Sequence, residues 1–240
     1  LFLSLFFSCT LFSAGFTQTF ASDTITTSEG ELVLTFIGHG TLMFSFQGKT
    51  IHIDPVSRYA DYDKMKDADL VLITHTHGDH LDPGAIKKIT TPATTIICTE
   101  KCSERLKKGT VMRNGDSGTY AGINVKAVPA YNIVHKRQNN KPYHPKGEGN
   151  GYVVTCGDKN IYIAGDTEPV PGMKELGSID IAFLPMNLPY TMSPEMAAQA
   201  ARLITPDILY PYHYGSTDPG KLVTLLKENQ NIDVRIRDLR

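Results

Sequence analysis

One short stretch, Thr74-His75-Thr76-His77-Gly78-Asp79-His80-Leu81-Asp82, restricts the fold of this chain more than any other part of it. It directly follows the apolar run Asp69-Leu70-Val71-Leu72-Ile73. A short apolar run that leads into turn residues is typical of a buried β-strand. We therefore expect a strand that delivers a polar, glycine-containing loop to the edge of a sheet.

The spacing of the side chains in this loop indicates a metal site. Successive side chains of an extended backbone point to opposite faces, so His75 and His77 point the same way and can hold one ion. Asp79 and His80 lie further along the turn, where they can reach a second ion. Neutral imidazole and carboxylate suit zinc and, less selectively, iron or manganese. A single histidine is more often an ordinary hydrogen-bonded residue, but the spacing of this set argues against that interpretation.

The stretch resembles the H-x-H-x-D-H motif of the metallo-β-lactamase-fold hydrolases, and later segments resemble the subgroup that contains the ascorbate-6-phosphate lactonases. The resemblance runs from about Leu32 to the C-terminus. It implies an α/β fold, a four-layer αββα sandwich of two mixed β-sheets. The motif is specific for the superfamily and says little about the substrate.

The same resemblance assigns three further residues at strand ends. It implies that Asp166, after Gly165, is a carboxylate bridging two ions and that His213 is the last imidazole ligand. Asp54 would support the metal loop from behind by orienting a ligand, although an Asp before proline is also a common turn former. We expect two divalent ions, most simply zinc with manganese or iron as alternatives, bridged by Asp166 and a hydroxide. The expected ligands are His75 and His77 on one ion, and Asp79, His80 and His213 on the other.

The third imidazole of the first ion is where the chain departs from the family pattern. Asn132 holds the place of that ligand in many relatives, and an amide oxygen is a much poorer zinc ligand than imidazole. His135 and His144 are the candidates on the following loop. The segment 143–147 resembles a His-Pro-Lys-Gly segment of the lactonase-like subgroup, and flanking prolines stiffen it, which favours His144. His135 stays as the alternative, although the cationic side chains beside it disfavour a nearby ion.

The order of expected elements agrees with the implied fold. Each half of the chain supplies strands and then helices, which favours two mixed sheets packed face to face with helices outside. The expected strands are 31–37, 41–46, 49–53, 69–73, 94–98, 123–128, 151–156, 160–164, 179–184, 208–212 and 232–236, and the expected helices are 83–89, 100–108, 194–204 and 218–227. We expect one metallo-hydrolase domain, residues 31–240, preceded by an aperiodic linker, 22–30.

Composition limits the partners. With 24 basic and 25 acidic residues in 240, the formal net charge is −1, so nothing favours nucleic acid or a membrane surface. Residues 1–21 carry no charge and resemble a signal peptide or a lipoprotein leader, too short and interrupted for a membrane span. We expect export to the periplasm or outer surface, with Cys9 as an alternative lipid anchor. A homo-oligomer stays open.

The chemistry that such a site serves is hydrolysis, because a bound metal lowers the pKa of water and polarises the bond under attack. Asp79 could orient the attacking hydroxide, and His39 and Tyr190 are candidates for contacting a small-molecule substrate. We expect a metal-dependent hydrolase of a small ester, lactone or phosphodiester. The alternatives are an exported metal-binding protein without catalysis, a β-lactamase-type amide hydrolase, and a diiron redox protein, against which His77 argues because those proteins have Glu there.

Overall fold

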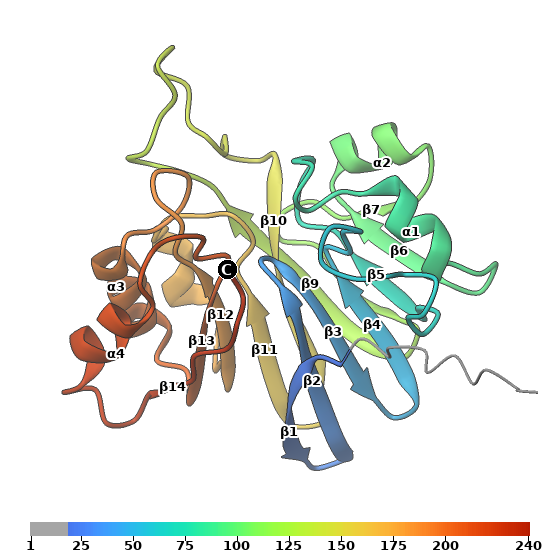
Figure 1. The fold of residues 1–240 in the computed structure, drawn as a ribbon, viewed down its shortest axis with the longest axis horizontal. Helices are drawn as coiled ribbons and strands as arrows, with labels where there is room; N and C mark the ends of the chain where they lie inside the picture. The colour runs from blue at the N-terminus through green and yellow to red at the C-terminus, as the bar shows by residue number, and fades with distance from the viewer. Residues whose placement is uncertain (1–18) are drawn as a thin grey trace, which may run out of the picture.

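The chain folds into two seven-stranded sheets that pack face to face, with helices on both outer faces (Figure 1). The structure is a computed structural model, and it describes residues 19–240. The predicted αββα sandwich is therefore confirmed. Most of the leader, including Cys9, lies outside the described residues. Within them, no helix is long and apolar enough to cross a membrane.

The first sheet keeps the order of the chain. Its strands are β1 (Ala21–Thr27), β2 (Gly30–Gly38), β3 (Thr41–Phe46), β4 (Lys49–Ile53), β5 (Leu70–Leu72), β6 (Thr95–Cys98) and β7 (Thr110–Val111). The first four strands are antiparallel, and β4 to β7 are parallel. Helices α1 (Pro83–Ile89) and α2 (Glu100–Leu106) supply buried side chains to the outer face of this sheet.

The second sheet repeats this plan. Its strands are β8 (Ser117–Tyr120), β9 (Ile123–Ala130), β10 (Gly149–Cys156), β11 (Lys159–Ile163), β12 (Ile181–Pro185), β13 (Ile208–Tyr212) and β14 (Asp233–Val234). Strands β8 to β11 are antiparallel and β11 to β14 are parallel. The short helix η1 (Pro171–Glu175) and helices α3 (Pro194–Ile204) and α4 (Gly220–Leu226) cover its outer face (Figure 1).

The period of the strands decides which layer each side chain joins. In β5, Leu70 and Leu72 join the core between the sheets, whereas Val71 joins the core under α1 and α2. Phe44 of β3 and Phe183 of β12 meet across the central layer with ring centroids 5.9 Å apart. Because both faces of β5 are covered, its residues are continuously apolar, which is why this strand was predictable from the sequence.

The prediction that residues 22–30 form a linker is wrong, because most of this segment belongs to a strand of the first sheet. Residues Ala21–Thr27 form β1, which pairs antiparallel with β2 along its length. The strand was missed because it lies at the sheet edge and is mostly exposed, so it has no apolar alternation. The short strands β7 and β8 were missed for the same lack of signal.

A half-buried charge fixes β1 to residues near the C-terminus. Asp23 accepts two hydrogen bonds from the Arg237 Nη2 group, at 2.7 and 2.6 Å, and one from the Tyr210 hydroxyl. Burial raises the pKa of Asp23, but the hydrogen bonds from Arg237 and Tyr210 outweigh burial and hold that pKa below its ordinary value. The ionised form of Asp23 therefore stabilises the fold.

Asp23→Asn should lower the free energy of unfolding by about 2 kcal/mol at neutral pH, because hydrogen bonds to a charged group contribute about 1.5–3 kcal/mol. A depressed pKa makes this stabilisation fully present above the unfolded-state value, about 3.9, and lost as the pH falls through the folded-state value. In urea unfolding, the difference from wild type should shrink below about pH 4. Asp238→Asn is the control, because that side chain is 78% exposed. Equal stability of Asp23→Asn and wild type at neutral pH would contradict the prediction.

Candidate metal centre

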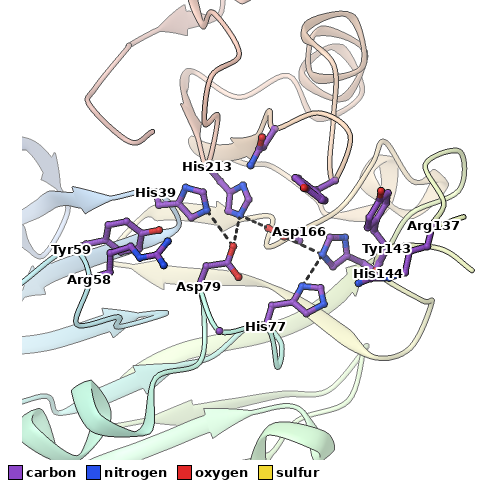
Figure 2. A pocket seen from close by; sticks show the side chains of 13 residues that line it. His39, Arg58, Tyr59, His77, Asp79, Arg137, Tyr143, His144, Asp166 and His213 are labelled. Atoms are coloured by element: carbon purple, nitrogen blue, oxygen red, sulfur yellow. Dashed lines mark hydrogen bonds and ion pairs between the residues drawn. The ribbon is translucent and has the colours of Figure 1, made fainter.

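The polar residues singled out in the sequence meet at one edge of the sandwich, where strands of both sheets end (Figure 2). The loop after β5 carries His75, His77, Asp79 and His80, and the loop between β9 and β10 carries His144. Asp166 follows β11, His213 follows β13, and His39 lies in the turn between β2 and β3. Parallel strands put their carboxyl ends at the same edge, which explains why residues far apart in the chain converge.

The first group consists of His75, His77, His144 and Asp166. Four pairs of their ligand atoms, involving Nε2 of His75 and His144, Nδ1 of His77 and Oδ2 of Asp166, lie 3.0–3.7 Å apart. Ligand atoms about 2.0–2.2 Å from a tetrahedral zinc ion lie roughly 3.3–3.6 Å from one another. The residues present therefore fit a zinc-sized divalent ion.

The second group consists of His80 and His213 around the other oxygen of Asp166. Asp79 adjoins this group through His213, whose Nε2 lies 3.5 Å from Asp79 Oδ2, and Asp79, His213 and His39 form a further, overlapping set. Asp166 Oδ1 lies 3.4 Å from both His80 Nε2 and His213 Nε2. These three buried atoms have no hydrogen-bond partner among the described residues. Buried polar atoms without a partner destabilise a fold unless something satisfies them, and a cation would satisfy all three at once.

Asp166 is held where both groups can share it. The preceding Gly165 has φ +65°, and a Cβ atom added to it would lie 2.8 Å from the carbonyl oxygen of Asn150. Only glycine fits this turn, because other residues rarely adopt that φ and none has room for a side chain there. The close contact directs the chain so that Asp166, 5% exposed, points between the two sets of imidazoles.

Asp54 and Thr74 orient two of the imidazoles from behind. Asp54 accepts hydrogen bonds from the backbone N–H and the hydroxyl of Thr74, at 2.8 and 2.6 Å, and its Oδ2 lies 2.7 Å from His80 Nδ1. Because Asp54 can only accept, Nδ1 of His80 carries the proton and Nε2 faces the ion site. The Thr74 hydroxyl also lies 3.0 Å from His75 Nδ1 and fixes that ring in the same way. Asp54 thus contacts the loop that carries the histidines from the end of β4.

His144 and His135, which the sequence left as alternatives, lie in different places. His144 Nε2 is 3.1 Å from Asp166 Oδ2 and belongs to the first group. His135 points at Glu168 instead, with its Nδ1 2.8 Å from Glu168 Oε1. Asn132 touches the group only through His144, because its Oδ1 lies 2.6 Å from His144 Nδ1.

The site favours ionised carboxylates. Burial raises the pKa of Asp166, but the charges of His213 and His80 outweigh burial and leave it well below its ordinary value. Burial and the neighbouring His80 hold the pKa of His75 well below its ordinary value. His80 is the exception: burial lowers its pKa, but Asp166 and Asp54 raise it to about 9. Ionised carboxylates and neutral imidazoles are the forms that bind a cation. A cation at this site must therefore displace the proton on His80 Nε2, whereas the proton on Nδ1 stays with Asp54.

A pocket of about 460 Å³ opens over the two groups (Figure 2). The two predicted substrate contacts, His39 and Tyr190, both line it. His39 Nε2 lies 3.3 Å from Oδ2 of Asp79, whose side chain is 37% exposed. Sequence reasoning missed the other lining side chains, which are Arg58, Tyr59, Arg137, Tyr143 and Asn187. Arg58, Tyr59 and Asn187 come from loops without a motif. Arg137 and Tyr143 lie in the loop between β9 and β10, where the sequence analysis weighed only the histidines as site residues.

Comparison with known proteins agrees with this geometry. Residues 33–213 match the family described as the beta-lactamase superfamily domain. A UPF0173 metal-dependent hydrolase from Pyrococcus abyssi is 34% identical over 83% of this chain and 94% of its own length.

Solved structures show the same likeness. A putative metal-dependent hydrolase from Parabacteroides distasonis has a TM-score of 0.88 and 50% identity, over 92% of this chain and all (100%) of that chain. CmlA, a diiron β-hydroxylase from Streptomyces venezuelae, has a TM-score of 0.69 and 15% identity, over 87% of this chain and 53% of that chain. At that identity the second likeness concerns the fold alone.

Proposed function

The chain belongs to the metallo-β-lactamase superfamily, among the metal-dependent hydrolases designated UPF0173, and from this premise we propose that it cleaves a small ester, lactone or phosphodiester with two divalent ions. The observation that carries the proposal is that Asp166 offers one oxygen to each of two ligand groups. His75, His77 and His144 would complete one ion site, and Asp79, His80 and His213 the other. We propose zinc, because the ligands are mostly imidazoles at tetrahedral spacing.

Bound divalent ions supply water with a pKa lowered from about 15.7 towards about 7 and polarise the bond under attack. Asp79 and Asp166 both line the pocket, and Asp79 is the more exposed of the two carboxylates. Burial raises the pKa of Asp79, but hydrogen bonds from His213 and His39 outweigh burial and hold that pKa well below its ordinary value. Asp79 is therefore ionised and can accept a hydrogen bond from the attacking water, which orients it. His39 adjoins Asp79 and can hold a proton at Nε2 for the leaving group.

The pocket favours a substrate that carries negative charge. Arg58 and Arg137 are its two arginines, and they lie at opposite ends of it (Figure 2). The two aspartates that line the pocket, Asp79 and Asp166, already face the ligand groups. An anionic group on the substrate could pair with either guanidinium while the two aspartates hold the ions. A carboxylate-bearing or phosphate-bearing lactone or ester fits this arrangement, and it is the substrate class closest to the lactonase-like resemblance.

Zinc-loaded protein should hydrolyse members of a panel of lactones, esters and phosphodiesters, and a chelator should abolish the activity. Each substrate is supplied in a neutral form and in a form with an added carboxylate or phosphate, and a β-lactam tests the amide alternative. Arg137→Ala should raise KM for the anionic forms about tenfold, the effect of about 1.4 kcal/mol, and leave the neutral forms unchanged. Arg58→Ala tests the other end of the pocket in the same way.

Lys136→Ala is the matched control, because it removes a neighbouring positive charge that does not line the pocket. The absence of chelator-sensitive hydrolysis across the panel would reject the proposed function. Equal changes in KM for neutral and anionic substrates would reject the anion preference and leave the hydrolase proposal standing.

A further inference from the structure

Glu168 is a completely buried carboxylate that the proposed reaction does not use. It stands two residues after Asp166, and both of its oxygens are occupied. The backbone N–H groups of Ile133, Val134 and His135 donate to it at 2.6–2.7 Å. Such a carboxylate keeps its charge because several donors replace its lost hydration. Glu168 therefore fixes the start of the loop that carries His144 into the site.

A side-chain amide continues this contact to the metal ligand. Asn132 Nδ2 donates to Glu168 Oε1 at 3.0 Å and to the carbonyl oxygen of Tyr190 at 2.9 Å. Both partners are acceptors, so this end of the amide must be the NH₂ group. The opposite end, Oδ1, accepts from the backbone N–H of His144 at 2.9 Å and lies 2.6 Å from its ring Nδ1.

This chemistry determines the tautomer of His144. Because Oδ1 of Asn132 can only accept, Nδ1 of His144 must carry the proton. In the neutral ring Nε2 then has the lone pair, and it faces His77 Nδ1 at 3.2 Å and Asp166 Oδ2 at 3.1 Å. Asn132 thus does for His144 what Asp54 does for His80.

We propose that Glu168 and Asn132 are positioning residues that hold His144 in the Nδ1–H tautomer with Nε2 aimed at the first metal. The inference rests on the proposed function for the identity of the first metal site. One turn, 166–168, then places both the carboxylate shared by the two groups and the carboxylate that supports the third imidazole. Asn132 stands where many relatives have an imidazole ligand, and here it orients His144, the imidazole that takes over that role.

The first test is the tautomer of His144 in metal-free protein, read from long-range ¹H–¹⁵N correlations. Wild type should show Nδ1–H and Asn132→Ala should lose that preference, whereas Asn160→Ala, which removes a side-chain amide away from the site, should keep it. A His144 ring in metal-free wild type whose Nδ1 carries no proton would overturn the proposal without reference to any variant or to catalysis.

The second test is zinc affinity by competition with a chelator. Asn132→Ala and Glu168→Gln should weaken one of two bound zinc ions about 10- to 100-fold, the range measured when a group that orients a ligand is removed. The other ion should stay within about threefold. Asn160→Ala is the control, because it removes side-chain amide contacts to Thr155 and Ser178 away from the site.

The two failures are distinguishable. Two zinc ions bound at wild-type affinity by Asn132→Ala would overturn the positioning role. A wild-type protein that binds no zinc would reject the proposed function. The tautomer of His144 is measured in metal-free protein, so it would still decide whether Asn132 orients that ring.

Discussion

Asp166→Ala should weaken both metal sites at once and reduce hydrolysis by about 10³-fold or more. The reason is geometric: Oδ2 of Asp166 lies 3.1 Å from His144 Nε2, and Oδ1 lies 3.4 Å from His80 Nε2 and from His213 Nε2. Loss of one group that stabilises charge in a buried site typically lowers a rate by 10²- to 10³-fold, and here two ions lose a ligand. Metal analysis of the purified variant should give less than one equivalent where wild type gives two.

The comparison with His213→Ala makes the result specific to a shared carboxylate. His213 does not belong to the first group, so its removal should release one equivalent and leave the other. Asp166→Asn keeps the shape of the side chain but loses its charge, and it should resemble Asp166→Ala in metal content. Undiminished metal in both Asp166→Ala and His213→Ala would sink the binuclear proposal.

Thermal unfolding provides a readout that needs no substrate. An ion that binds the folded state alone stabilises it by RT ln(1 + [L]/Kd), about 2.7 kcal/mol at a hundredfold excess over Kd. Added zinc should therefore raise the melting temperature of wild type. It should raise that of Asp166→Ala much less, and a full zinc-induced shift in the variant would contradict a shared ligand.

The parts of the site that the sequence predicted are those with local spacing or a strand end. His75, His77, Asp79 and His80 lie on one loop, so their spacing alone indicated convergence. Asp54 and His213 directly follow strands, Asp166 lies three residues after one, and the common plan of the two sheets brings these strand ends to one edge. The resemblance to a known family assigned these strand ends to a single metal site, which spacing alone could not do.

The parts that could not be predicted depend on pairings between distant segments. Glu168 looks like an ordinary polar residue in a turn, and only the fold shows that its oxygens meet the backbone of 133–135. Arg58 and Arg137 reach one pocket from opposite ends, which no local pattern reveals. Strand β1 has no apolar alternation, because its stabilising contacts are the ladder to β2 and the charge of Asp23.

His144→Ala should strip or weaken one metal ion and abolish hydrolysis, whereas His135→Ala should leave both nearly intact. His144 offers Nε2 to the first group at 3.2 Å from His77 Nδ1, and its other nitrogen is held by Asn132. The His135 ring lies against Glu168 instead, and Glu168 keeps its three backbone donors when that ring is removed. The two variants delete the same chemical group from the same loop, so each controls for the other.

Metal analysis and single-substrate kinetics on both variants decide between the two histidines. If His135→Ala were the damaging change, the ring would have to leave Glu168 and the loop 133–144 would have to rearrange on metal binding. If Asn132 entered the coordination shell, its Oδ1 would have to release both N–H groups of His144, at 2.9 and 2.6 Å. Either result would reject His144 as the third ligand and leave the hydrolase proposal intact, because the shared carboxylate and the remaining imidazoles do not depend on this choice.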